Sequence, residues 1–303
     1  MFTKFSSKIV SAGAVITTLI LGGALCGAET SGSIEKLEAA ARQGDADAEF
    51  QLGKAYATGA GVPMNIAKSL ELYKEAATKG EMRAQNNLGA MYKTGNGVPR
   101  NLEEAVKWFQ KSAEQGNPAG EDNLGEMLLK GKGAAKDAKL ALAWFKKAAD
   151  QGLTSAELHL GQLYYFGDDG VPKDYKLAMP PILKAANSGN AIAENIAGVL
   201  CKIGADGKPD LKEAVRWYRA AAEAGDAKGQ FNLGALYTTG DGVERSPAKA
   251  YLWLNLSSAQ GETLAENMLN DYKHGMTTTE IVEGERLLRD YQTKATARPN
   301  PGK

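Results

Sequence analysis

The side chains that most often carry out catalysis are few in this sequence and lie far apart. Its 303 residues contain two histidines, His159 and His274, and two cysteines, Cys26 and Cys201. His159 and Cys201 are of the right types for a nucleophilic pair, in which an imidazole activates a thiol. Cys201, however, aligns with Tyr56 at a core position of the repeat that fills most of the chain. We therefore expect the thiol to be buried and unreactive.

The motifs that bind metals, phosphates or reactive nucleophiles are absent from the sequence. It contains no HExxH, no CxxC, no GxSxG and no GxxxxGK[ST]. Paired acids such as Glu103-Glu104 and Asp168-Asp169 are expected to face water. The sequence thus predicts no catalytic residue, no metal site and no cofactor, and we expect the protein not to be an enzyme.

Four tryptophans could form a platform on which sugars stack, but a structural role explains them better. Trp108, Trp144, Trp217 and Trp253 occupy the same position of the repeat, each followed by a bulky residue. Such a shared position indicates packing between helices. We expect Trp108→Ala to leave a cavity and to cost several kcal/mol.

A sequence phrase recurs along the chain at a nearly constant interval. It opens at a glycine and reads GDADAEFQLGKAY, GEMRAQNNLGAMY, GNPAGEDNLGEML, GLTSAELHLGQLY, GNAIAENIAGVLC and GDAKGQFNLGALY, from Gly44, Gly80, Gly116, Gly152, Gly189 and Gly225. The openings are 36 or 37 residues apart, and a partial copy starts at Gly261. A fixed period of this length predicts a solenoid of stacked units.

Each unit has the pattern of two helices joined by a turn. In the first unit, Ala48, Leu52 and Tyr56 form one stripe of a helix. Gly53 and its equivalents lie within this helix, where glycine is unfavourable, which indicates that a neighbouring helix crosses closely. A glycine-rich turn ends the helix, and a second amphipathic helix follows, as in residues 101–115.

These phrases resemble the Sel-one-like repeat (SLR) family, a relative of the tetratricopeptide repeat. The shared motifs are A-x-x-x-L-G-x-x-Y-x-x-G-x-G-V and A-x-x-W-[FY]-x-x-A-A-x-x-G, and they cover about residues 33–291. The resemblance implies an all-α fold, an α/α solenoid wound as a right-handed superhelix. It also implies an adaptor or scaffold function. One branch of the family, associated with β-lactam binding, carries two cysteines in each repeat, which this chain lacks.

The ends of the chain differ from the repeats. Residues 1–28 have a positive start, an apolar stretch and small residues, which predicts a signal peptide cleaved after Ala28, with an uncleaved membrane anchor as the alternative. The expected divisions are a capping helix at 29–43, six repeats at 44–79, 80–115, 116–151, 152–188, 189–224 and 225–260, capping helices at 261–292 and a disordered tail at 293–303.

Export and charge limit the possible partners. Cleavage removes two lysines and no acids, leaving 34 basic and 36 acidic residues, so nucleic acid is not an expected partner. We expect a soluble, monomeric protein in the bacterial periplasm or outside the cell, without membrane insertion after cleavage and with a protein or peptide partner.

The fourth repeat carries two prolines where its second helix is expected. Pro181 aligns with the tryptophan position, and Pro180 precedes it. Because proline inside a helix removes a hydrogen bond and clashes with the preceding turn, we expect a kink, or a helix that restarts near Pro180.

The first helices of the repeats offer a surface for binding. The family resemblance places them on the concave side, where an Asn just before Leu-Gly, as at Asn87, Asn123 and Asn232, can bond the backbone of a bound peptide. The candidate residues on this face are Phe50, Gln51, Lys54, Asn86, Asn87, Asp122, Asn123, Glu126, Leu158, His159, Asn195, Phe231 and Asn232. The alternative is that these amides only bond neighbouring helices.

The expected function is therefore that of a non-catalytic interaction module of the bacterial envelope. The resemblance is compatible with a signalling regulator, an assembly adaptor, a host-interaction factor or a toxin-immunity protein. An enzyme or binder acting on cell-wall material or β-lactams is the alternative.

Overall fold

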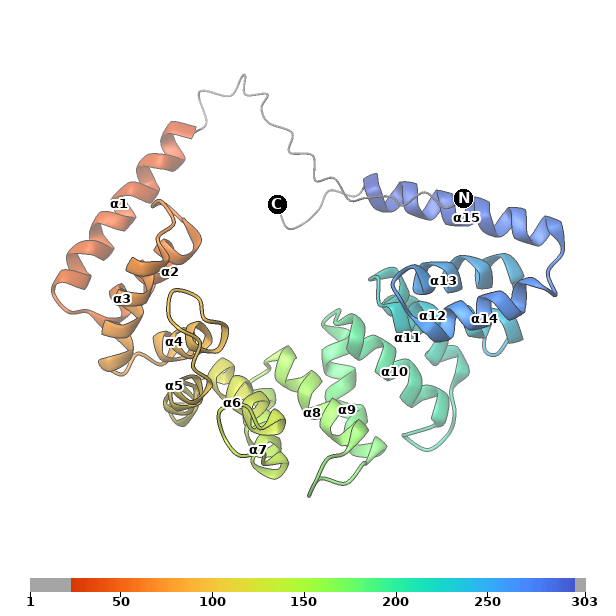
Figure 1. Cartoon of the computed structure of the whole chain (residues 1–303), viewed down its shortest axis with the longest axis horizontal. Coiled ribbons are helices and arrows are strands. Elements are labelled where there is room, and N and C mark those ends of the chain that lie inside the picture. Colours follow the sequence, from red (N-terminus) through yellow and green to blue (C-terminus); the bar gives the residue numbers. More distant parts are fainter. Residues whose placement is uncertain (1–22, 298–303) are drawn as a thin grey trace. The chain divides into compact units, whose positions relative to one another are not determined.

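The computed structural model describes residues 23–297, and in that range the regular secondary structure is helical (Figure 1). The helices are α1 (Gly23–Arg42), α2 (Ala46–Thr58), α3 (Ile66–Thr78), α4 (Met82–Thr94), α5 (Leu102–Glu114), α6 (Pro118–Lys130), α7 (Ala138–Asp150), α8 (Thr154–Phe166), α9 (Tyr175–Asn187), α10 (Ala191–Ile203), α11 (Leu211–Glu223), α12 (Ala227–Thr239), α13 (Pro247–Ala259), α14 (Thr263–Lys273) and α15 (Thr278–Ala297). Among these residues, no helix is both long and apolar enough to cross a lipid bilayer.

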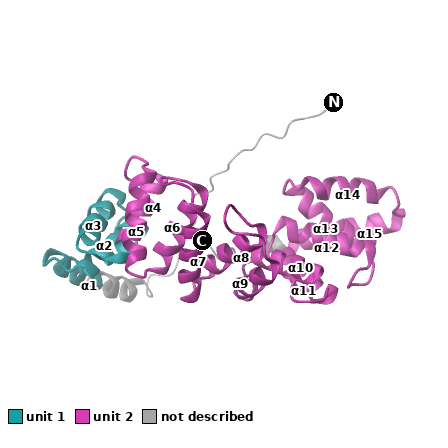
Figure 2. Ribbon diagram, turned by 90° about the horizontal axis from the view of Figure 1, so that it is seen from below, with its two compact units in different colours: residues 1–84 teal, residues 85–303 magenta. Residues whose placement is uncertain are grey.

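The chain divides into two compact units, residues 1–84 and 85–303 (Figure 2). In the first unit, α2 packs against both α1 and α3. In the second, the first helices α6, α8, α10 and α12 each pack against the helix that follows, as α10 does against α11, and the second helices from α5 to α13 each pack against the next first helix, as α11 does against α12. This alternation is that of an all-α solenoid of helix pairs, and the predicted fold class is confirmed.

The helix ends follow from residues at fixed positions of the repeat. Asp226, the residue before α12, accepts a hydrogen bond from the backbone N–H of Gly229 at 2.6 Å and so caps the first turn. At the other end of α12, Gly240 ends the helix with a φ of 86°. Only glycine adopts this left-handed conformation without steric cost, which explains why a glycine recurs at this turn.

The predicted apolar stripe of the first helix is buried in the first unit. Ala48, Leu52 and Tyr56 are all less than 9% exposed. Gly53 faces the Tyr73 ring, and a Cβ atom placed on this glycine would lie only 2.9 Å from it. The close helix crossing inferred from the recurring glycine is therefore confirmed.

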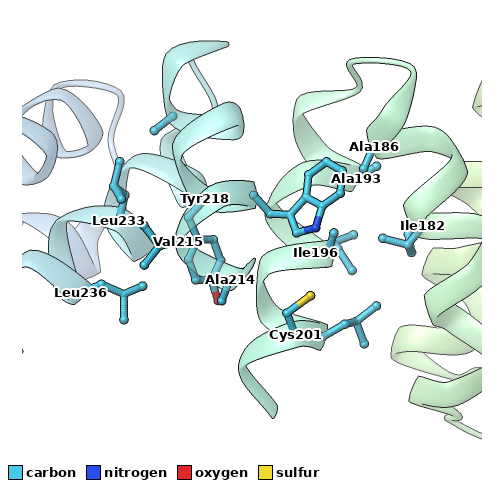
Figure 3. Packing of buried hydrophobic residues seen from close by; sticks show 14 of the residues in the cluster. Ile182, Ala186, Ala193, Ile196, Cys201, Ala214, Val215, Tyr218, Leu233 and Leu236 are labelled. Atoms are coloured by element: carbon cyan, nitrogen blue, oxygen red, sulfur yellow. The ribbon is translucent and has the colours of Figure 1, made fainter. Parts of the chain in front are cut away.

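In the second unit the same contact recurs with other partners. A Cβ atom on Gly198 of α10 would lie 2.5 Å from the ring of Tyr218 on α11, which belongs to the core that also contains Cys201 and Leu233 (Figure 3). The equivalent glycines of α4, α6, α8 and α12 face Phe109, Phe145, Ile182 and Leu254. In each pair the first helix thus has a glycine, without a side chain, where a bulky residue of the second helix fills the space.

The tryptophans only partly play the packing role predicted for them. Trp217 and Trp253 are buried, but Trp108 and Trp144 are partly exposed, and Lys111 lies over the Trp108 ring at 4.1 Å. The residue that fills the space between the helices is the next one, Phe109, which is fully buried. One residue along a helix turns the side chain by about 100°, so two neighbours cannot face the same partner.

The two prolines of the fourth repeat lie inside one uninterrupted helix, α9. The expected restart at Pro180 does not occur. Each proline removes the hydrogen bond to the carbonyl four residues earlier, at Lys176 and Leu177, and both of these residues are exposed. Water can therefore satisfy the two carbonyls, while Met179 and Ile182 remain buried on the inner side.

The first helix, α1, begins at Gly23, earlier in the chain than the predicted capping helix at 29–43. Residues 1–22 of the predicted signal peptide lie outside the described range, and residues 23–28 form the start of α1. Ile34 and Leu37, within the predicted capping helix at 29–43, are both half-buried.

The C-terminal end is closed by α15, which packs on α13. Thr277 caps α15 reciprocally with Glu280: the Thr277 N–H donates to the Glu280 carboxylate at 2.7 Å, and the Glu280 N–H donates to Thr277 Oγ1 at 3.3 Å. Gly284 allows close packing, since a Cβ there would lie 2.8 Å from Tyr251. Disorder was expected from Thr293, whereas α15 continues to Ala297, because residues 293–298 contain no glycine or proline before Pro299. Residues 298–303 lie outside the described range.

Candidate partner-binding surface

The two residues considered for nucleophilic chemistry have separate environments. Cys201 lies in the core with Ile196 and Tyr218, and burial raises the pKa of its thiol to about 11 (Figure 3). The Nδ1 atom of His159 instead lies 2.7 Å from an oxygen of Asp122. A thiol that stays protonated at neutral pH is a poor nucleophile. In the described part of the chain, no group of three or more His, Cys, Asp and Glu residues is arranged to hold a metal ion.

The polar residues predicted on the first helices form hydrogen bonds between successive repeats. Asn123 Nδ2 donates to Asn86 Oδ1 at 2.9 Å, and Asn232 Nδ2 donates to Asn195 Oδ1 at 2.8 Å. The His159–Asp122 contact occupies the same repeat positions. Each bond connects residues 37 apart in the sequence, and the bonded amides are only partly exposed or buried. Predicted residues of the second and third, third and fourth, and fifth and sixth repeats are thus bonded to one another.

These hydrogen bonds support a structural role for the asparagines, but they leave groups with which the amides can also bind a peptide backbone. An amide has two N–H groups and a carbonyl oxygen, and the bond to the neighbouring repeat uses one N–H of Asn123 or Asn232. Asn87, the third residue of the motif, accepts a longer hydrogen bond of 3.4 Å from Asn86.

Two further candidates are held by neighbouring charged or polar groups. Glu126 on α6 forms ion pairs with Lys93 and Lys130. Burial alone would raise the pKa of this carboxyl, but hydrogen bonds from the two lysines and their charges lower it to about 2. Asp122 also accepts a hydrogen bond from Ser155 Oγ at 2.7 Å.

The candidates in the first unit differ in accessibility. Phe50 is buried, with the Arg83 guanidinium 4.3 Å from its ring centre. Gln51 is half-buried, whereas Lys54 is exposed. The aromatic side chain expected to contact a partner is therefore covered within its own unit.

The first helices α8, α10, α12 and α14 line a groove of about 770 Å³ in the second unit. The groove contains three predicted residues, Asn195, Phe231 and Asn232. Its other lining residues are Gln162, Tyr165, Phe166, Ile192, Ile196, Val199, Asp226, Ala227, Lys228, Glu262 and Leu264. Leu158, a further predicted residue, is buried in the core of this unit.

The apolar walls of the groove include side chains that are unusually exposed. Phe166, Ile192 and Leu264 are 62%, 49% and 60% exposed. The sequence carries a signal for two of them. Ile192 and Leu264 occupy the position held by charged residues such as Asp47 and Lys228 in other repeats. Single exposed apolar residues are common on protein surfaces, but several that line one groove are typical of a contact surface.

Comparison with known proteins identifies the family of these repeats. A model of the Sel1 (Sel-one-like) repeat matches residues 46–81, 83–117, 118–153, 154–179, 191–226 and 227–262. The chain belongs to the Sel1 repeat family. The predicted repeats start at the opening glycine, two or three residues before each match, and the fourth match ends directly before Pro180. No curated protein matches the chain.

Solved Sel1 structures show the same fold. A Sel1 repeat protein from Oxalobacter formigenes is 30% identical, with a TM-score of 0.64, and the match covers 77% of this chain and 95% of that protein. A protective antigen of uropathogenic Escherichia coli with an SLR fold is 32% identical, with a TM-score of 0.51 over 88% of this chain. This chain spans only 65% of the length of that antigen. Sel1 repeats typically mediate protein–protein interaction.

Proposed function

We propose that this Sel1 repeat protein is a non-catalytic module that binds a protein or peptide partner through the first helices of its second unit. The observation that carries the proposal is the groove between α8, α10, α12 and α14, where Phe166, Ile192 and Leu264 remain exposed. Large exposed apolar side chains that gather in one hollow are typical of a binding surface. The amides of Gln162 and Asn232 in the same groove can hold the backbone of an extended chain.

We further propose that the protein acts in the periplasm or outside the cell. The support is the signal-peptide pattern of residues 1–28. The E. coli relative is a protective antigen, which agrees with an exported role. Fractionation of the producing cells, followed by sequencing of the mature N-terminus, tests this, and a chain that starts at Glu29 is the expected result. A cytoplasmic chain that retains Met1 would contradict it.

Site-specific photo-crosslinking in the producing cell tests the surface. A photoreactive residue is placed at Ile192 or Leu264, in the groove, and in matched chains at Leu140 or Leu177, on second helices outside it. The four side chains are 49%, 60%, 44% and 51% exposed, so exposure alone does not separate them. We expect specific adducts from the two groove positions only.

Two results would contradict the binding surface. Equal adducts from all four positions would show non-specific contact, and adducts confined to Leu140 or Leu177 would move the surface to the second helices.

The alternative function, action on cell-wall material or β-lactams, has its own test. Incubation of the pure protein with labelled muropeptides and with a chromogenic β-lactam should give no turnover. Sustained turnover, lost on substitution of a groove residue, would establish an enzyme in place of the binding module.

A further inference from the structure

One end of the groove carries a concentration of acidic side chains. Asp226 and Glu262, the residues before α12 and α14, both line it. Glu194, in the first turn of α10, lies close enough to Asp226 for the Asp226 charge to raise the pKa of its carboxyl, in addition to the larger effect of burial. Two successive repeats thus place a carboxylate in the groove, and a third carboxylate, that of Glu194, lies near one of them.

Glu194 lacks the partner that Glu49 and Glu121 have at the same position of their repeats. It is only 8% exposed, and its Oε2 atom is buried without a hydrogen-bond partner. In those two other repeats the residue 30 positions later, at the end of the second helix, supplies one: Gln151 donates to Glu121 at 2.8 Å, and Lys79 pairs with Glu49. For Glu194 that position holds Ala224, which has no polar side chain.

The positive groups near this end offset the acids only in part. Lys228 is the one lysine or arginine among the residues that line the groove, against Asp226 and Glu262 in the lining and Glu194 behind them. The N-terminal ends of α12 and α14 carry partial positive charge, but Asp226 already bonds the Gly229 N–H, and Glu262 reaches the Leu264 N–H at 3.5 Å. Burial raises the pKa of Asp226, hydrogen bonds from the Gly229 and Lys228 N–H groups and the charge of Lys228 lower it, and the charge of Glu262 raises it. One lysine beside three carboxylates leaves room for a second cation at this end.

We propose that the groove takes an extended peptide segment whose Lys or Arg side chain lies against Asp226 and Glu262, with the buried charge of Glu194 behind them. Aliphatic residues beside the cation contact Ile192 and Leu264, and the amides of Asn195 and Asn232 face the peptide backbone. The segment is therefore basic and apolar in alternation. This inference rests on the proposed function, because it names the chemistry of the partner at the same surface.

The test uses the full mature chain and defined peptides. The peptide Ac-Ser-Leu-Lys-Leu-Ser-amide and its versions with Arg, Gln or Glu in place of Lys are titrated into protein labelled at the isoleucine methyl groups. Ile192 and Ile196 line the groove, and Ile66 in the first unit serves as a distant reporter. We expect the Lys and Arg peptides to shift Ile192 and Ile196 with an affinity about five- to tenfold above that of the Gln peptide, and the Glu peptide to bind most weakly.

Charge variants identify the anchor. Asp226→Asn retains a side chain that caps helices well, and together with Glu262→Gln it should remove the preference for Lys and Arg. Lys228→Gln should strengthen binding of the Lys peptide by about two- to threefold, because it removes the positive charge at the site. Glu121→Gln is the matched control. Glu121 lies in α6, outside the groove, at the repeat position that Glu194 occupies in α10. This variant should leave the affinities for the Lys and Gln peptides unchanged.

The outcomes separate this inference from the proposed function. If all four peptides shift Ile192 and Ile196 equally, the groove binds peptides but the cationic preference is refuted. If none shifts these methyl groups, the inference is refuted, and the crosslinking result decides the proposed function independently. If the Asp226/Glu262 double variant unfolds, the Lys228→Gln arm still decides, since weaker binding by that variant would refute the charge argument.

Discussion

The side-chain amide of Asn232 donates a hydrogen bond to the side-chain oxygen of Asn195 in the preceding repeat, at 2.8 Å. Because Asn195 is buried, Asn232→Ala leaves an unpaired acceptor and should lower the free energy of unfolding by about 1–3 kcal/mol. The double variant with Asn195→Ala should lose less than the sum of the single losses. Urea titrations followed by circular dichroism measure both, and additive losses would show that the bond contributes nothing.

The family motif itself is tested by changing Asn87, Asn123 and Asn232 together to Ala. A lower melting temperature is expected from loss of the inter-repeat hydrogen bonds, and weaker partner binding is expected from loss of the Asn232 amide in the groove. A lower melting temperature with unchanged binding would show that these amides are structural only, and a retained melting temperature with lost binding would show that they act only on the partner.

Gly198→Ala should destabilise the second unit although alanine favours helices. The new methyl group would lie 2.5 Å from the buried ring of Tyr218, and crowding of this kind costs about 1–3 kcal/mol. The sixth repeat pairs its glycine with Leu254, so Tyr218→Leu offers a background with more room. The cost of Gly198→Ala should shrink in that background, and an unchanged or larger cost would contradict the steric argument.

Phe109→Ala and Trp108→Ala should differ strongly in stability. Phe109 is fully buried, and its removal should cost about 3–5 kcal/mol, whereas the partly exposed Trp108 should cost clearly less. Thermal unfolding of the two variants under the same conditions gives the comparison. Equal losses would show that Trp108 contributes as much as Phe109 to the packing between the helices, as the sequence predicted.

Two Glu→Gln variants should change stability in opposite directions at neutral pH. Glu126 has its pKa held at about 2 by Lys93 and Lys130, so its ionised form stabilises the fold above the unfolded-state pKa. That contribution is lost as the pH falls towards 2. Glu126→Gln should therefore cost about 1 kcal/mol at pH 7, and this cost should disappear near pH 2.

The ionised carboxylate of Glu194 has the opposite effect on the stability of the fold. Burial raises its pKa, so the ionised carboxylate destabilises the fold above that raised value, and the penalty vanishes below the unfolded-state pKa. Glu194→Gln should raise the melting temperature at pH 7 and have no effect near pH 3. A lower melting temperature at pH 7 would show that Glu194 has a stabilising partner.

Much of the fold could be predicted from the repeat pattern, because each helix pair packs through the same few positions of the repeat. The spacing of Ala48, Leu52 and Tyr56 located the buried face, and the glycine at Gly53 located the close crossing, since both depend on helical periodicity. The pattern could not distinguish Trp108 from Phe109. Adjacent residues on a helix both lie near an interface, and only the position of the facing glycine decides which one enters it.

The sequence by itself determined the class of the fold, the length of the unit and the absence of familiar catalytic motifs, because these depend on local periodicity and residue type. Only the tertiary structure decided where the groove lies and which side chains line it. Phe166, Ile192 and Leu264 come from three repeats, and Glu194, Asp226 and Glu262 meet because successive first helices begin on one side. The asparagines likewise bond residues 37 positions apart, and such contacts depend on how helices stack, which no single repeat records.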